Sequence, residues 1–134
     1  MVRYRAGMAR KKTPTLTEAE YRLMDILWTN GPLSVADVAD KVGEPPLAYN
    51  TVLTTLRILE QKGYLSHRAS GRAFIYKAAV ERDEAQRTVV NHMVSRFFGG
   101  SPRDLVLNLL DSESVDAAEL ARLRELIDRK AGPQ

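Results

Sequence analysis

Polar and hydrophobic positions follow a helical period over the first half of the chain. Apolar residues recur at spacings of three and four and predict helices over residues 17–30, 34–42 and 48–62. Thr17 is the predicted N-cap of the first helix, where it begins a capping-box pattern. Gly63 follows the third helix at the C′ position, where glycine is common. The pattern therefore predicts three helices in series, with the second and third joined by a short turn.

The period changes from helical to extended after the third helix. Residues 64–68 and 73–77 read as two strands, and a turn is expected over residues 69–72. Leu33 is placed to add a very short edge strand. Three helices followed at once by a β-hairpin form the element order of a winged helix-turn-helix domain. We therefore expect residues 16–80 to be a winged helix.

The last third of the chain is predicted to be helical again. Helices are expected over residues 81–98, 101–110 and 116–130, with Pro102 at the first helical position of the middle one. Three thin amphipathic helices cannot build a large core alone, so their apolar rows should pack on the winged helix or on another chain, and we favour another chain. The rows are Val89, Met93 and Phe97; Leu105, Val106 and Leu109; and Leu120, Leu123 and Ile127.

The expected fold is mostly α with a small β-hairpin wing, an α+β arrangement. Residues 1–15 are interpreted as a flexible basic arm, residues 16–80 as the winged helix-turn-helix domain and residues 81–134 as a helical dimerisation domain. Trp28 lies among the periodic apolar residues of the first helix. We expect it to be a core anchor.

Charge is unevenly distributed along the chain. Residues 1–80 carry 12 Lys and Arg against 7 Asp and Glu, a net charge of +5, whereas residues 81–134 carry 8 against 10, a net charge of −2. The positive part is the one suited to a polyanion such as DNA, although a surface of this size can acquire such an asymmetry by chance. The basic arm allows two interpretations, a solvated tail and a phosphate contact.

Composition argues against several classes of site. The chain has no cysteine, which removes disulfides, thiolate metal sites and cysteine nucleophiles and fits a reducing cytoplasm. His67 and His92 lie in different predicted elements without a ligand cluster, so we expect no metal and no other cofactor. No G-x-S-x-G, H-E-x-x-H or glycine-rich phosphate loop is present, so we expect no enzymatic activity. No apolar stretch approaches the roughly 20 residues that span a bilayer, and we expect a cytoplasmic protein without membrane association.

Several segments, taken in order, resemble a known family. Together they are similar to the penicillinase-repressor and methicillin-resistance-repressor family over nearly the whole chain after residue 15. The segments are Glu18–Glu20, Met24–Trp28, Ala48–Leu56, Lys62–Leu65, Gly71–Tyr76, Gly99–Gly100, Leu105–Leu109 and Leu120–Lys130.

The resemblance implies a homodimeric transcriptional repressor that holds a double-stranded DNA operator with its winged helix. It also implies that a sensor-linked protease relieves repression by cutting the dimerisation domain, in a system that responds to antibiotics through a membrane metalloprotease. A copper-responsive branch of the family carries a cysteine-rich C-terminal motif. That mechanism is excluded here because the chain has no cysteine.

In a helix-turn-helix, the second helix enters the major groove and its N-terminal residues meet base edges. Here these residues are Asn50, Thr51 and Thr54, with Tyr49 and Arg57 nearby. Asn and Thr side chains can hydrogen-bond to bases, and Arg57 can reach phosphate or guanine. In the alternative interpretation, Thr51 only caps the helix and the other residues face solvent.

The predicted hairpin carries Arg68 and Arg72 on either side of Gly71. This arrangement suits cations laid along a DNA backbone or minor groove, and solvated turn charges are the alternative. The family tends to have Arg at the position of Ile58 in this chain. Either that contact is missing or Arg57 supplies it from a different angle, which leaves the operator sequence open.

The resemblance places a cleavage site between Asn108 and Leu109. Family repressors are cut after an Asn in a segment similar to Leu105–Leu109, and the residue after the cut is usually Phe where this chain has Leu. The alternative is that these are ordinary core residues of a short helix. A buried helical bond is a poor protease substrate, so cleavage should require local opening.

The residues alone leave two alternative functions open. One is a winged-helix adaptor for protein partners, in which the basic residues only provide solvation. The other is a small hydrolase whose catalytic triad is assembled from distant residues. The adaptor predicts that no salt-sensitive DNA binding will be found. The hydrolase predicts a nucleophile in a pocket, and no motif in the chain indicates one.

Overall fold

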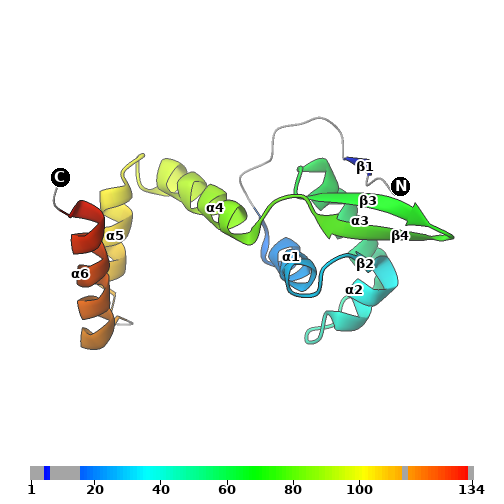
Figure 1. Cartoon of the computed structure of the whole chain (residues 1–134), viewed down its shortest axis with the longest axis horizontal. Coiled ribbons are helices and arrows are strands. Elements are labelled where there is room, and N and C mark those ends of the chain that lie inside the picture. The colour runs from blue at the N-terminus through cyan, green and yellow to red at the C-terminus, as the bar shows by residue number, and fades with distance from the viewer. Residues whose placement is uncertain (1–4, 7–15, 113–114, 133–134) are drawn as a thin grey trace. The chain divides into compact units, whose positions relative to one another are not determined.

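The computed structural model describes residues 5–6, 16–112 and 115–132 (Figure 1). The chain forms two compact units, Met1–His92 and Met93–Gln134. Most of the predicted basic arm lies outside the described residues. The predicted boundary after residue 80 stays a prediction, because the fourth helix runs from the first unit into the second.

The elements follow the predicted order, and the expected fold class, mostly helical with a small hairpin wing, is confirmed. The described helices and strands are β1 (Arg5–Ala6), α1 (Glu18–Asn30), β2 (Leu33–Ser34), α2 (Val35–Lys41), α3 (Tyr49–Gln61), β3 (Leu65–Ser70), β4 (Ala73–Ala78), α4 (Arg82–Phe97), α5 (Pro102–Leu110) and α6 (Ala117–Ala131) (Figure 1).

Glu20, in the first turn of α1, forms an ion pair with Lys62, the residue that follows α3. The Glu20 backbone N–H donates to Thr17 Oγ1 at 3.1 Å and the Thr17 N–H donates to Glu20 Oε1 at 2.8 Å, so the predicted capping box is confirmed. Lys62 Nζ donates to the two oxygens of the same buried carboxylate at 2.8 and 3.0 Å. A buried carboxylate is costly unless it is paired and hydrogen-bonded, and Glu20 has both kinds of partner.

Strands β3 and β4 form the hairpin, called the wing below. Their antiparallel ladder extends as far as the pair Ser70 and Ala73, so the turn consists of Gly71 and Arg72. The turn expected over residues 69–72 is therefore too long, because its first half belongs to the strand. Gly71 has a φ of 59°, and no described residue other than glycine has a positive φ, which fits a type II′ hairpin turn.

Short strands complete both edges of this sheet, whose order is β1-β3-β4-β2. Leu33 of β2 pairs with Tyr76, so the expected short edge strand is confirmed. Arg5 of β1 pairs with His67, which places the described part of the predicted arm against β3. Pairing at the β3 edge satisfies backbone groups that would otherwise be open to another chain.

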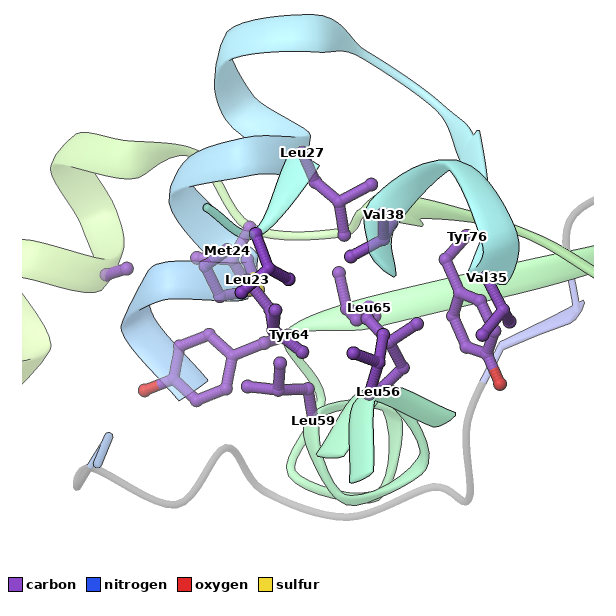
Figure 2. Packing of buried hydrophobic residues seen from close by; sticks show 14 residues of the cluster. Leu23, Met24, Leu27, Val35, Val38, Leu56, Leu59, Tyr64, Leu65 and Tyr76 are labelled. Carbon is purple, nitrogen blue, oxygen red and sulfur yellow. The ribbon is translucent and has the colours of Figure 1, made fainter. Parts of the chain in front are cut away.

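The core of the first unit forms where α1, α2 and α3 pack against the sheet (Figure 2). Trp28 packs against this cluster, and its Nε1 donates to the Val80 carbonyl at 2.8 Å, so its expected role as a core anchor is confirmed. The largest fully buried side chains are Tyr64, Tyr76, Leu23, Met24, Leu27, Leu56, Leu59, Leu65, Val38 and Val52.

Helices α5 and α6 of the second unit begin with side-chain caps. The Asp104 N–H donates to Ser101 Oγ at 3.1 Å, and the Glu119 N–H donates to Asp116 Oδ1 at 2.8 Å. Pro102 stands in the first turn of α5, as predicted. Neither helix, each described along its full length, has a buried residue in the single chain. Among the described residues, no helix is both long enough and apolar enough to cross a membrane.

Candidate nucleic-acid interface

Helix α3 has one buried face and one face open to solvent. Val52, Leu56 and Leu59 are buried at helical spacing, which turns the other face outward. All five residues that the sequence predicted for DNA contact on this helix are exposed. They are Tyr49, Asn50, Thr51, Thr54 and Arg57.

Thr51 is not the cap of α3. The N-cap is Ala48, which has extended backbone and no side-chain cap hydrogen bond. Thr51 lies in the first turn, where its backbone carbonyl accepts a hydrogen bond from the Thr55 hydroxyl at 2.7 Å. The alternative in which Thr51 serves only as a cap is therefore wrong.

A groove lies between α3 and the wing, called the α3–wing groove below. It has a volume of about 490 Å³ and brings together Tyr49, Arg57 and Arg72 from two elements separated in the sequence. Two arginines on its walls make it suited to a phosphate-bearing strand. The remaining lining residues are Ser34, Val35, Ala36, Leu53, Ser70, Ala73 and Phe74.

The other predicted contact residues lie outside this lining. Asn50, Thr51 and Thr54 are on the exposed face of α3, and Arg68 lies half-buried within β3 opposite Ile75. The structure thus separates the predicted residues into an exposed helix face, the groove and the middle of the hairpin.

Phe74 is a groove residue that was not predicted from the sequence. Its side chain is 43% exposed, and its ring meets the His67 ring edge-on with centroids 5.0 Å apart. The alternation of strand residues places Phe74 on the same face as Tyr76, yet Tyr76 is buried. Strand periodicity alone could not show which of the two residues the helices would cover.

Tyr76 belongs to the core beneath α3 and is only 1% exposed. Burial is the main cause that raises the pKa of Tyr76, and the carboxylate of Glu60 raises it further. The charge and the hydrogen bond of Arg57 act in the opposite direction.

A second polar contact joins α3 to the wing. The buried carboxylate of Glu60 lies 2.7 and 2.8 Å from His67 Nδ1. The His67 ring packs against the Tyr76 ring, with centroids 5.4 Å apart. No role of His67 was predicted from the sequence, because neither residue type nor spacing identifies Glu60 as its partner.

The C-terminal helices expose large apolar side chains in the single chain. Phe97 is 76% exposed, and Val89, in the same predicted row, is partly buried. An apolar surface of this kind is a candidate protein interface. The other predicted dimer residues that are exposed are Met93, Leu120, Leu123 and Ile127, and Val106, Leu107, Leu109, Leu110 and Leu126 join them.

The predicted cleavage site lies in the last turn of α5. Asn108 and Leu109 are helical, as expected, but both side chains are exposed in the single chain. The bond was expected to be buried. Burial at this position would have to come from a partner, because α5 has no buried residue in this chain.

Comparison with known proteins identifies the family. Residues 16–129 match the family model described as penicillinase repressor. The chain belongs to the penicillinase repressor family. The match to this family extends from the residues before α1 into α6, so the resemblance found in the sequence is confirmed.

Relatives in the penicillinase repressor family match along most of their length. The penicillinase repressor of Bacillus licheniformis is 24% identical over 119 residues, which cover 88% of this chain and 93% of the relative. The methicillin resistance regulatory protein MecI of Staphylococcus aureus (strain N315) is 22% identical over 120 residues, which cover 89% and 98%. The solution structure of the DNA binding domain of the repressor BlaI superposes with a TM-score of 0.51 at 26% identity, over 56% of this chain and 93% of that domain.

Proposed function

We propose that this chain is a homodimeric transcriptional repressor that binds a pseudo-palindromic DNA operator through α3 and the wing. Membership of the penicillinase repressor family supports the coarse assignment as a transcriptional repressor. The observation that carries the finer proposal is the α3–wing groove with Arg57 and Arg72 on its walls. A groove between a recognition helix and a basic hairpin is suited to one strand of a duplex backbone.

The exposed face of α3 supplies the base readers in this proposal. Asn50, Thr51 and Thr54 are close enough to the helix N-terminus to reach base edges in a major groove. Arg57, one turn further along, can reach guanine or phosphate. Arg68 and Arg72 of the wing contact the sugar-phosphate backbone, which fixes the position of α3 but does not read sequence.

The C-terminal helices hold the partner subunit in this proposal. Their exposed apolar rows would be covered by the same rows of a second copy, since a two-fold dimer presents one surface to itself. The two winged helices then face two half-sites of opposite direction. This is the reason for expecting a pseudo-palindromic operator.

Proteolysis is proposed to relieve repression at the bond between Asn108 and Leu109. The proposal rests on the family resemblance, and the relatives named for penicillinase and methicillin resistance suggest a β-lactam as the inducing class of compound. The position in the last turn of α5 also supports it, because a cut there separates α6 from the winged helix. A sensor-linked protease is the proposed partner.

The test is selection of duplexes from a random-sequence library, followed by affinity measurements at several salt concentrations. We expect a pseudo-palindromic consensus. Three arginines in each of two subunits correspond to a slope of roughly −5 for the logarithm of affinity against the logarithm of salt, at about −0.9 per phosphate contact. Failure to enrich any sequence, together with affinity that does not depend on salt, would favour a protein-interaction adaptor with the same fold.

A further inference from the structure

The α3–wing groove is lined by aromatic side chains as well as by arginines. Among the described residues 16–80, three large hydrophobic side chains are exposed, namely Tyr49, Ile58 and Phe74. Tyr49 and Phe74 both line the groove, one from α3 and the other from β4. Two exposed aromatic rings in one groove indicate a surface that a binding partner covers.

The Phe74 ring packs against a side chain that is itself held by a polar contact. It meets the His67 ring edge-on, with centroids 5.0 Å apart and an angle of 65° between the ring planes. His67 Nδ1 lies 2.7 Å from the buried carboxylate of Glu60 in α3. Phe74 therefore presents a preformed apolar wall to the groove, and a preformed wall loses little conformational freedom on binding.

The charges around this ring favour a nucleic-acid strand as the occupant of the groove. Arg57 and Arg72 belong to the same lining, and the described residues of that lining include no Asp or Glu. Phe74 follows Arg72 by two residues on the wing. A backbone strand alternates phosphates with sugars, so arginines beside an aromatic ring match both parts of the strand. The sugar of DNA lacks the 2′-hydroxyl of RNA and is therefore the more apolar of the two.

We propose that Phe74 is a specificity-determining residue, which contacts the deoxyribose of the operator strand in the α3–wing groove and disfavours ribose there. The inference rests on the proposed function. A 2′-hydroxyl placed against the ring would lose water without gaining a hydrogen-bond partner, which is unfavourable. Arg57 and Arg72 attract the phosphates of DNA and RNA alike, so the selection of DNA at this site comes from the ring.

Hydroxyl-radical footprinting on the selected operator tests the sugar contact, because the radical attacks exposed deoxyribose. The wild-type chain should protect sugars in each half-site, and saturating Phe74→Ala should leave some of these sugars exposed while the other protection stays. Ile75→Ala is the matched control, because Ile75 lies on the opposite face of β4 and outside the groove lining. Its footprint should equal that of the wild type. An unchanged footprint of Phe74→Ala would overturn the inference.

A ribonucleotide scan of the operator tests the selection for deoxyribose on the unmodified chain. An operator in which one footprinted sugar is replaced by ribose should bind about tenfold more weakly where that sugar meets Phe74. Phe74→Ala should bind this operator and the all-DNA operator equally, because the smaller side chain leaves room for the hydroxyl and for water. An equal penalty in both chains, or a penalty at no position, would contradict the role of the ring.

Failure of the inference can be distinguished from failure of the proposed function. A wild-type chain that binds no duplex would overturn both. A chain that binds a pseudo-palindromic operator with the same affinity at every ribonucleotide position would overturn only the inference. Urea denaturation checks that Phe74→Ala is folded, and its midpoint should stay close to that of the wild type because the Phe74 side chain is 43% exposed.

Discussion

Single residues on α3 and on the wing differ in what they can recognise. Asn50 and Thr54 are exposed on the helix face, where donors and acceptors can match base edges. Arg72 stands in the hairpin turn on the wall of the α3–wing groove. A charge in that position attracts phosphate irrespective of sequence.

Substitutions at these positions should therefore have different effects. Asn50→Ala or Thr54→Ala should lower discrimination between the operator and a scrambled duplex by roughly 1 to 3 kcal/mol, whereas Arg72→Ala should weaken both duplexes alike. Fluorescence anisotropy on both duplexes measures this difference. Thr55→Ala is a matched control, since Thr55 is a less exposed threonine of the same helix that bonds to the Thr51 carbonyl. Similar behaviour of all variants would contradict the division into base readers and phosphate contacts.

Two buried tyrosines make the fold sensitive to alkaline pH. Burial is the main cause that raises the pKa of Tyr64 and of Tyr76 above the ordinary value of 10.0, and the carboxylates of Glu20, Glu84 and Glu60 add to it. Above about pH 10 the unfolded chain releases phenolic protons that the folded chain retains. The free energy of unfolding should therefore have the full contribution of these groups below pH 10 and lose it as pH rises through their folded-state pKa.

Urea denaturation at a series of pH values checks this expectation. The midpoint should decline above about pH 10, and the decline should be less steep in Tyr64→Phe, which removes one of the two groups. Tyrosinate absorbance should develop together with unfolding. A midpoint that fell equally steeply in Tyr64→Phe would show that other groups cause the alkaline transition.

At the scale of elements, the two units are stabilised differently. In the first unit, polar contacts between elements supplement the core: Glu20 with Lys62, and Glu60 with His67. In the second unit, α5 and α6 have well-formed caps but no buried residue in the single chain. Isolated helices of this length are marginal in water, so burial against a partner should supply their stability.

The apolar row of α6 should be the most sensitive part of the dimer. Leu123 is 41% exposed in the single chain, so Leu123→Asp should leave the first unit folded but place an unpaired carboxylate in the dimer interface. We expect sedimentation to report a monomer and binding to the full operator to fall to that of a half-site. Ala121→Asp makes the same change of charge on another face of α6 and should stay dimeric. If the Leu123→Asp variant remained dimeric, the dimer interface would instead be expected at the row Val89, Met93 and Phe97.

At the scale of the whole molecule, the proposed switch acts on DNA through the dimer. A cut after Asn108 leaves α1 to α4 and their DNA contacts in one fragment and separates α6 from it. Binding of the second half-site is nearly intramolecular once the first is occupied. Loss of the dimer should therefore lower operator affinity by orders of magnitude without altering any DNA contact.

Cells exposed to a β-lactam should contain a fragment that ends at Asn108, which mass spectrometry of the recovered repressor can detect. A chain truncated after Asn108 should reproduce the monomeric state and the weak operator binding. If target genes were induced while the chain stayed intact, proteolysis would not be the switch. Ligand binding or titration of the repressor would then be the candidate controls.

The sequence by itself determined the order and the ends of most elements, because the signals for them are local. The helical spacing of apolar residues and the Thr17 capping box were enough to predict α1. Ser101 and Pro102 were enough to predict where α5 begins. The exposed face of α3 also followed from the sequence, since the periodicity that buries Leu56 turns Asn50 and Thr54 outward.

Only the tertiary structure decided how distant residues meet. The partners Glu60 and His67 join α3 to a strand of the wing, and no spacing rule in the chain specifies such a pair. The α3–wing groove and the inclusion of Phe74 in it depend on how the helices cover the sheet. Local periodicity fixes which face a residue is on, whereas the packing of elements against one another fixes which residues on that face are buried and which polar groups they meet.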